Sequence, residues 1–428
     1  MVHEVRRLEF RQVLKLRPGA SRNPQVSTML LPVQVSSPIR RAGQAEVELL
    51  ALCASTLLSG ERATSLRTAL ALPHDWEAFE RWAEYHSMIP AVAHVLAEYG
   101  GEFVPREVMD ELRRRWMLIA ANNLARVQDW RHAMQALETA GIPAISLKGP
   151  ALALLVYQNV ALRQFMDLDL LIRPVDVPKA CAALTCNGYR LDSPLANNWD
   201  GRLMWSGDRE LKFVQDGNGA VLDVHWGVLP PNCPFQMPVD LLFDFARKEH
   251  QNGTSFLSFS REHLFVFLCA HGAKHCWRSL QWLCDLAGYV NRFQDLDWES
   301  CIRQAITMHC ELVVAHSLLL AQQVLGLTLP EAIDSFVRED SKANMAAAKA
   351  IRFLMNPADM GAYDALDYYL SFTRNWREKL HCTARQIFVP NAADWERVRL
   401  PHYLSFIYYV IRPLRLVLDR LTWAVIGR

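Results

Sequence analysis

The chain has 428 residues, of which 51% are hydrophobic and 21% are charged, a balance typical of globular proteins. Its formal net charge of +1 excludes a strong overall field that would favour nucleic acid or an acidic partner. The ten cysteines include no C-x-x-C pair, which is unlike a zinc ribbon or a small disulfide scaffold. Because there is also no signal-peptide pattern and no apolar run of about 18 residues, we expect reduced thiols, a cytoplasmic location and no transmembrane segment.

The first part of the chain is predicted to be a tail followed by helices. Residues 1–40 are basic and are expected to be flexible, as chain termini often are. Residues 41–141 are predicted to form an N-terminal helical region, with amphipathic helices at 44–59 and 75–99 and either one or two helices over 104–140. Gly141-Ile142-Pro143 ends this region with a helix stop and a break.

The pattern then changes to a compact α/β core, predicted over residues 142–237. A short strand at 144–147 leads through the Lys148-Gly149-Pro150 turn into a helix. Further on, we expect a strand at 167–172, a helix at 174–187, and strands at 210–215 and 220–228 joined by a hairpin at Asp216-Gly217-Asn218-Gly219. Helical periodicity returns from about residue 238 and predicts a C-terminal helical domain over 238–428.

Asp167 and Asp169 lie two residues apart inside an apolar, strand-like run. Successive side chains of a strand point to opposite faces, so both carboxylates share one face. Two adjacent carboxylates repel each other unless a cation lies between them. The pair therefore indicates a divalent metal site better than it indicates a stabilised core.

A third carboxylate, Asp223, lies in a later predicted strand with alternating polar and apolar residues, where it shares a face with His225. If the two strands are neighbours, the three aspartates form a set of oxygen ligands that suits Mg²⁺. His225 is then a ligand, an acid or a structural group beside Trp226.

The segment that precedes the aspartate strand contains three candidates for binding phosphate. Lys148 and Gly149 precede a predicted helix, whose first N–H groups and dipole favour anions. Arg163 lies four residues before Asp167 and is a second candidate for contacting a phosphate oxygen.

These segments resemble an uncharacterised bacterial nucleotidyltransferase family of the DNA polymerase β superfamily. The resemblance comprises the Lys148-Gly149 turn, Arg163 before the Asp167-Leu168-Asp169-Leu170-Leu171 run, and Asp223-Val224-His225-Trp226. It extends over roughly residues 141–290. Most superfamily members have Gly-Ser in the first turn, whereas this chain has Lys148-Gly149 followed by Pro150, so a serine contact to phosphate is missing.

The resemblance implies an α+β fold: a polymerase-β-like core, with helices on a mixed sheet, flanked by N- and C-terminal helical regions. It also implies transfer of a nucleoside monophosphate from an NTP, with release of pyrophosphate. Two Mg²⁺ ions would be the cofactors of this reaction, with Mn²⁺ as an alternative. Asp167, Asp169 and Asp223 would be the catalytic and metal-binding residues, and Asp223 would also help to deprotonate an acceptor hydroxyl.

The acceptor is left open by the sequence: a small molecule, a sugar, a peptide or a protein. Two other functions are retained as alternatives, a toxin-like transferase that modifies tRNA or protein and a non-catalytic nucleotide-binding scaffold.

The segment after the core contains a second group of polar residues. Lys274 and His275 are candidates for reaching a nucleotide phosphate if their helix flanks the cleft. His271 and His275 have the i, i+4 spacing of a metal site, but Gly272 replaces the glutamate that a zinc protease needs. Asp285 is expected to bond a neighbouring helix or an arginine, and Trp282 is expected in the core.

The C-terminal segment is basic, with ten Arg or Lys residues against four acids from Arg374 to Arg428, interleaved with aromatic side chains. Such a segment can lie on a membrane surface or bind nucleic acid. We favour a pair of helices, broken at Pro413, that packs its apolar face on the domain and exposes its arginines to water.

Overall fold

The computed structural model describes residues 44–60, 62–192, 209–231, 233–356, 360–391, 394, 397–398 and 400–426. The predicted basic tail over residues 1–40 lies outside these ranges. Among the described residues, no helix combines the length and apolar composition needed to cross a bilayer.

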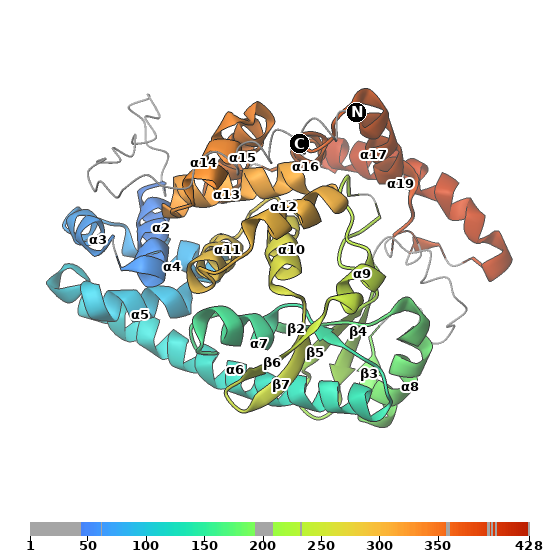
Figure 1. Ribbon diagram of the computed structural model, residues 1–428, viewed down its shortest axis with the longest axis horizontal. Coiled ribbons are helices and arrows are strands. Elements are labelled where there is room, and N and C mark those ends of the chain that lie inside the picture. Colours follow the sequence, from blue (N-terminus) through green and yellow to red (C-terminus); the bar gives the residue numbers. More distant parts are fainter. Residues whose placement is uncertain are drawn as a thin grey trace.

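A mixed sheet of seven strands lies at the centre of the fold, in the order β3-β4-β5-β2-β1-β7-β6 (Figure 1). The central pair, β2 and β5, is parallel, whereas β4 is antiparallel to β5 and β1 is antiparallel to β2. The strands are β1 Ile145–Ser146, β2 Asp167–Leu171, β3 Tyr189–Leu191, β4 Glu210–Gln215, β5 Val221–His225, β6 Arg247–Gln251 and β7 Thr254–Ser258. The predicted α+β architecture of a mixed sheet between helical regions is confirmed.

The helices before the sheet form most of the N-terminal region. They are α2 Gln44–Ser59, α3 Ala63–Leu70, α4 Trp76–Tyr85, α5 Ile89–Tyr99 and α6 Arg106–Thr139. The predicted helix at 44–59 is confirmed, and the 104–140 stretch is one helix of 34 residues. The single helix predicted over 75–99 is wrong, because the chain breaks at Ser87, where φ is +58°, and restarts at Ile89, with Pro90 in the first turn.

Helices between the strands cover the sheet, and the long α6 runs beneath it (Figure 1). They are α7 Gly149–Leu152, continued by a π-helical turn over Ala153–Tyr157, α8 Val177–Cys186 and α9 Val239–Asp244. Leu168, Leu170, Leu222 and Val224 are buried, as the alternation of β2 and β5 predicts. The hairpin between β4 and β5 is also confirmed, with Gly219 at φ +70°.

The helical periodicity predicted from residue 238 onward is wrong for residues 247–258. Strands β6 and β7 form a hairpin there, and β7 pairs in parallel with β1 at Ile145. The hairpin turn is Asn252-Gly253, in which both residues have positive φ, a strong hairpin signal. The predicted core boundary at residue 237 therefore falls before the last two strands of the sheet.

Helices resume after this hairpin and cover the upper side of the sheet in Figure 1. They are α10 Arg261–Lys274, α11 Leu280–Arg292, α12 Trp298–Thr307, α13 Glu311–Leu325, α14 Glu331–Glu339, α15 Ser341–Met355, α16 Ala362–Leu370, α17 Trp376–Phe388 and α19 Tyr408–Ile426. α17 and α19 lie at the opposite end of the molecule from α2 to α5 (Figure 1).

Some of the C-terminal arginines form ion pairs within the protein, and the prediction that these arginines are exposed to water is wrong for Arg412, which is buried. Arg412 and Arg415 both contact the buried Asp394, and Arg374 contacts Glu311. The predicted helix break at Pro413 is wrong, since α19 continues through it; the missing N–H removes one hydrogen bond near the helix start without ending the helix.

Candidate active site

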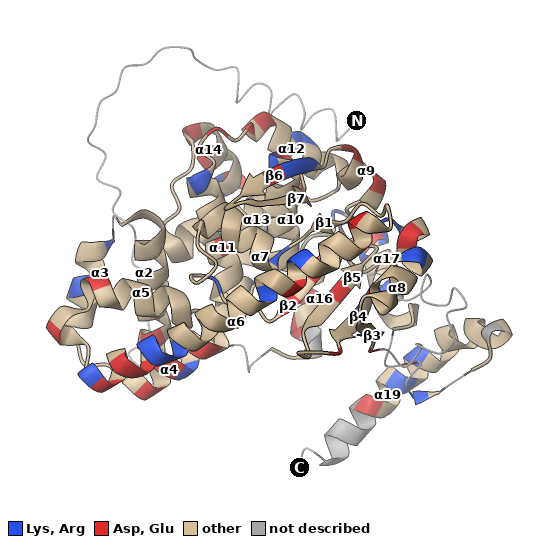
Figure 2. Ribbon diagram, turned by 90° about the horizontal axis from the view of Figure 1, so that it is seen from below, with Lys and Arg blue, Asp and Glu red and all other residues tan. Residues whose placement is uncertain are grey.

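Three aspartates meet on one face of the central strands. The parallel register of β2 and β5 places Asp169 directly opposite Asp223, and Asp167 opposite Val221. One ligand oxygen from each aspartate lies within 4.8 Å of the others. Figure 2 shows this acidic group where β2 and β5 run side by side. The neighbouring strands required by the sequence prediction are therefore present.

Asp169 is the buried member of this group, and two basic side chains share one of its oxygens. Lys148 Nζ lies 3.1 Å from Asp169 Oδ1, and His225 Nε2 lies 2.9 Å from the same oxygen. Burial alone would raise the pKa of Asp169, but the Lys148 ammonium and the His225 ring hold it below its ordinary value. Asp169 is therefore an anion at neutral pH.

Asp223 has the opposite electrostatic character. Burial, followed by the neighbouring Asp169 carboxylate, raises the pKa of Asp223 to about 6. Asp223 Oδ1 and Asp169 Oδ2 are both buried without a hydrogen-bond partner among the described residues. Two buried carboxylate oxygens without partners, beside a third carboxylate, fit a divalent cation that takes oxygen ligands.

His225 holds Asp169 in place. Its second nitrogen, Nδ1, lies 3.2 Å from Glu210 Oε2, so the ring bridges two carboxylates. Glu210 faces His225 in the antiparallel register of β4 and β5. The structure therefore places His225 as a partner of Asp169, and it adds Glu210, which sequence reasoning did not identify.

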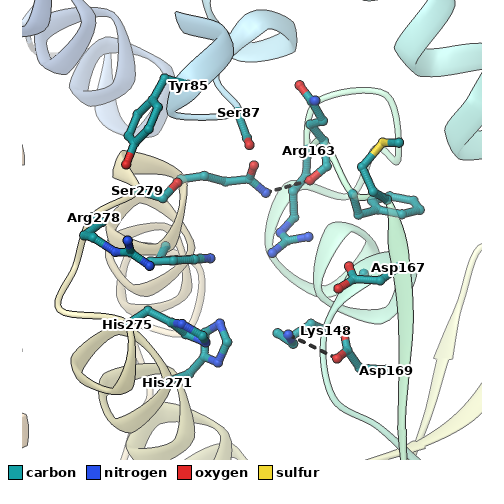
Figure 3. A pocket seen from close by; sticks show the side chains of 16 residues that line it. Tyr85, Ser87, Lys148, Arg163, Asp167, Asp169, His271, His275, Arg278 and Ser279 are labelled. Atoms are coloured by element: carbon teal, nitrogen blue, oxygen red, sulfur yellow. Dashed lines mark hydrogen bonds and ion pairs between the residues drawn. The ribbon is translucent and has the colours of Figure 1, made fainter. Parts of the chain in front are cut away.

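The Lys148-Gly149 turn lies beside the carboxylates and needs its glycine. Gly149 has φ +57°, and a Cβ there would lie 3.3 Å from the Asp167 carbonyl oxygen. Both residues line a pocket of about 460 Å³. Figure 3 shows Lys148, Asp167 and Asp169 on one wall of this pocket.

Arg163 also lines the pocket, but its guanidinium is bound elsewhere. Its Nε and Nη2 donate to the two oxygens of Asp285 at 2.9 and 2.8 Å, and both side chains are buried. The predicted partnership of Asp285 with an arginine is confirmed. The phosphate contact predicted for Arg163 is not supported, because the guanidinium is committed to a buried ion pair between the β2 loop and α11.

The opposite wall of the pocket comes from the junction of α10 and α11. His271, His275 and Arg278 lie there, facing the aspartates (Figure 3), together with Trp282, which was expected in the core. Burial lowers the pKa of His275 to about 3 and holds the pKa of His271 well below its ordinary value, so both rings are neutral.

Lys274, the predicted phosphate ligand on this segment, is not among the residues that line the pocket. Its backbone carbonyl accepts a hydrogen bond from Tyr369. The two histidines do not form part of a metal-binding group of three or more ligands; within the described ranges, that group is the three aspartates.

A mixed sheet that carries three aspartates on paired parallel strands, beside a Lys-Gly turn and a pocket, is the arrangement of a nucleotidyltransferase, an enzyme that transfers phosphorus-containing groups. The model of a family described as uncharacterised nucleotidyltransferase matches residues 73–326, and the chain belongs to this family. The match contains both walls of the pocket. Neither a curated protein nor a solved structure matches the chain.

Proposed function

We propose that the protein transfers a nucleoside monophosphate from an NTP to a hydroxyl-bearing acceptor, with Mg²⁺ held by Asp167, Asp169 and Asp223. The observation that carries this proposal is the meeting of the three carboxylates, two of which have a buried oxygen with no partner in the described part of the chain. Two Mg²⁺ ions suit this set, and Mn²⁺ is the alternative, since both take oxygen ligands. When bound, such ions stabilise the charge on the transferring phosphate.

The residues of the pocket have separate tasks in this reaction. Lys148 keeps Asp169 ionised and presents its ammonium to the nucleotide phosphates, while His225 fixes the orientation of Asp169. Asp223 accepts the proton of the acceptor hydroxyl as that oxygen bonds to the α-phosphorus. The bond from the α-phosphorus to the bridging oxygen breaks, and pyrophosphate leaves with the electron pair.

The acceptor is proposed only as a compound with a free hydroxyl: a small molecule, a sugar, a peptide or a protein. Eight of the ten cysteines are buried, and the location proposed for the protein is the reducing cytoplasm, where thiols remain reduced.

The test combines binding with transfer. Calorimetry with ATP, GTP, CTP and UTP in Mg²⁺ identifies the nucleotide, and the label from its α-³²P form is then followed into the molecules of a lysate. Asp167→Asn and Asp223→Asn are expected to reduce labelling by at least about 100-fold without unfolding the protein. The exposed Asp295, which pairs with Arg261, provides a matched control as Asp295→Asn.

Each outcome separates the candidate functions. Nucleotide binding without transfer to any molecule would favour the scaffold, and label in tRNA would favour the toxin-like transferase. A wild-type rate in Asp223→Asn would mean that the active site lies elsewhere. Absence of binding to all four nucleotides would reject every nucleotide-based function.

A further inference from the structure

The chain bends sharply where α10 meets α11, and this bend positions Arg278. Cys276 and Trp277 are consecutive non-glycine residues with φ of +54° and +52°, a backbone conformation that costs about 1–2 kcal/mol per residue. Trp277 is completely buried, and its backbone N–H donates to the Gly272 carbonyl at 2.9 Å. Strain that is retained in this way is frequent at functional sites.

Gly272 makes this bend possible. A Cβ at Gly272 would lie 2.3 Å from Cη2 of the Trp277 ring, so only glycine leaves room for the indole. The ring packs against the last turn of α10, and the next residue, Arg278, is thereby directed to the pocket wall that faces Asp167 and Asp169 (Figure 3).

Arg278 differs from the other arginine of the pocket in its partners. Arg163 is neutralised by Asp285, whereas no carboxylate in the described part of the chain forms an ion pair with Arg278. Arg278 Nε is buried and has no hydrogen-bond partner within the ranges that the structure describes. The Arg278 side chain lines the pocket without a described carboxylate to balance its charge, and an anionic ligand in the pocket would supply that balance.

The surroundings of Arg278 favour an anion with several charges. The neighbouring His275 ring is neutral, so it adds no positive charge that would compete with Arg278 for an anion. Lys148 faces the same pocket but is shared with Asp169. Arginine binds phosphate oxygens through two parallel N–H groups, and a nucleobase or a neutral sugar offers no such pair of charged acceptors.

We propose that Arg278 binds the β- and γ-phosphates of the NTP, the part that leaves as pyrophosphate. This inference rests on the proposed function and adds the recognition of the leaving group. The α-phosphate must lie at the aspartates, where the bond to the acceptor forms, so a cation on the facing wall meets the remainder of the triphosphate.

The test measures binding, not catalysis, with the full-length protein in Mg²⁺. The ligands are α,β-methylene analogues of the four NTPs, which cannot react, and the corresponding NMPs. Wild-type protein is expected to bind the triphosphate analogue of its nucleotide more tightly than the NMP. Arg278→Met is expected to weaken binding of the triphosphate analogue about 10- to 100-fold and to change binding of the NMP less than about twofold.

The controls separate charge from folding. Arg303→Met removes one positive charge from a surface pair with Glu299 and should leave both affinities unchanged. Arg278→Lys keeps a single charge but loses the fork and should give an intermediate affinity. Inorganic pyrophosphate should compete with the triphosphate analogue for wild-type protein and less well for Arg278→Met.

Three results would overturn the inference. The first is an unchanged triphosphate affinity in Arg278→Met; the second is an equal loss for triphosphate and NMP, which would place the contact at the α-phosphate or the base. The third needs no variant: wild-type protein that binds the NMP as tightly as the triphosphate analogue has no site for the leaving phosphates. Wild-type protein that binds no nucleotide would instead reject the proposed function itself.

Discussion

Replacing Arg163 by methionine is expected to lower the stability of the fold rather than the affinity for nucleotide. The guanidinium makes two hydrogen bonds to Asp285, and the exposed fractions of the two side chains are 5% and 2%. Methionine preserves much of the apolar stem but leaves the Asp285 carboxylate buried with the Tyr157 hydroxyl as its remaining partner among these contacts. Removing one member of a buried ion pair costs about 3–5 kcal/mol of unfolding free energy.

A double variant separates the lost pair from the unpaired charge. Arg163→Met combined with Asp285→Leu replaces both ions by apolar groups, a change that is often nearly neutral. The Tyr157 hydroxyl then loses its acceptor, at a cost of about 1 kcal/mol. We therefore expect the double variant to lie within about 2 kcal/mol of the wild type and to be more stable than Arg163→Met alone.

Urea unfolding followed by circular dichroism measures these differences. Arg303→Met, which breaks the exposed pair with Glu299, is the matched control and should cost less than about 1 kcal/mol. The reasoning would be refuted if Arg163→Met lost less than about 1 kcal/mol of stability while its affinity for the NTP fell tenfold. Arg163 would then be the phosphate ligand that its spacing to Asp167 predicts.

Three further predictions follow from burial and contacts. Gly272→Ala should cost about 1–3 kcal/mol in urea unfolding, because its methyl group would overlap the buried Trp277 ring. Burial lowers the pKa of His316 to about 3, so the folded protein holds a neutral ring while the unfolded chain gains a proton below pH 6.5. Wild-type protein should therefore lose up to about 3 kcal/mol relative to His316→Gln between pH 7 and pH 4; a constant difference would contradict this. Mg²⁺ at 100 times its dissociation constant should stabilise the wild type by about 2.7 kcal/mol in thermal unfolding, and EDTA should reverse this stabilisation. In Asp223→Asn most of the stabilisation by Mg²⁺ should be lost.

The sequence predicts those parts of the site that depend on local pattern. Alternation alone places Asp167 and Asp169 on one face of β2, and the Gly217 to Gly219 hairpin brings β4 back onto β5. The pairing of β2 with β5 is not local, so the sequence pattern leaves it as a condition, and the resemblance to the nucleotidyltransferase family implies only that all three aspartates bind metal. The β6 to β7 hairpin was missed because Arg247–Gln251 has no apolar residue to reveal a strand, although its Asn252-Gly253 turn was a readable signal.

Contacts between distant segments are where the sequence is least specific. Arg163 and Asp285 are separated by 122 positions, and although Asp285 was expected to bond a helix or an arginine, nothing in either segment identifies Arg163 as its partner. Glu210 reaches His225 only through the register of β4 on β5. Arg278 lies beyond the end of α10, so the helical spacing that drew attention to His271 and His275 did not extend to it.

Two arginines line the same pocket, and their partners determine how each can act. Arg163 is close in sequence to the aspartate strand, yet a carboxylate at 2.8 Å already satisfies it, so transferring it to a phosphate would leave Asp285 as a buried, unbalanced charge. Arg278 has no such carboxylate in the described part of the chain, and its buried Nε lacks an acceptor. Binding a phosphate therefore removes a cost at Arg278 and would create one at Arg163. Nearness to the metal-binding motif in the sequence is thus a weaker guide to a phosphate ligand than the presence of an uncompensated charge in the folded pocket.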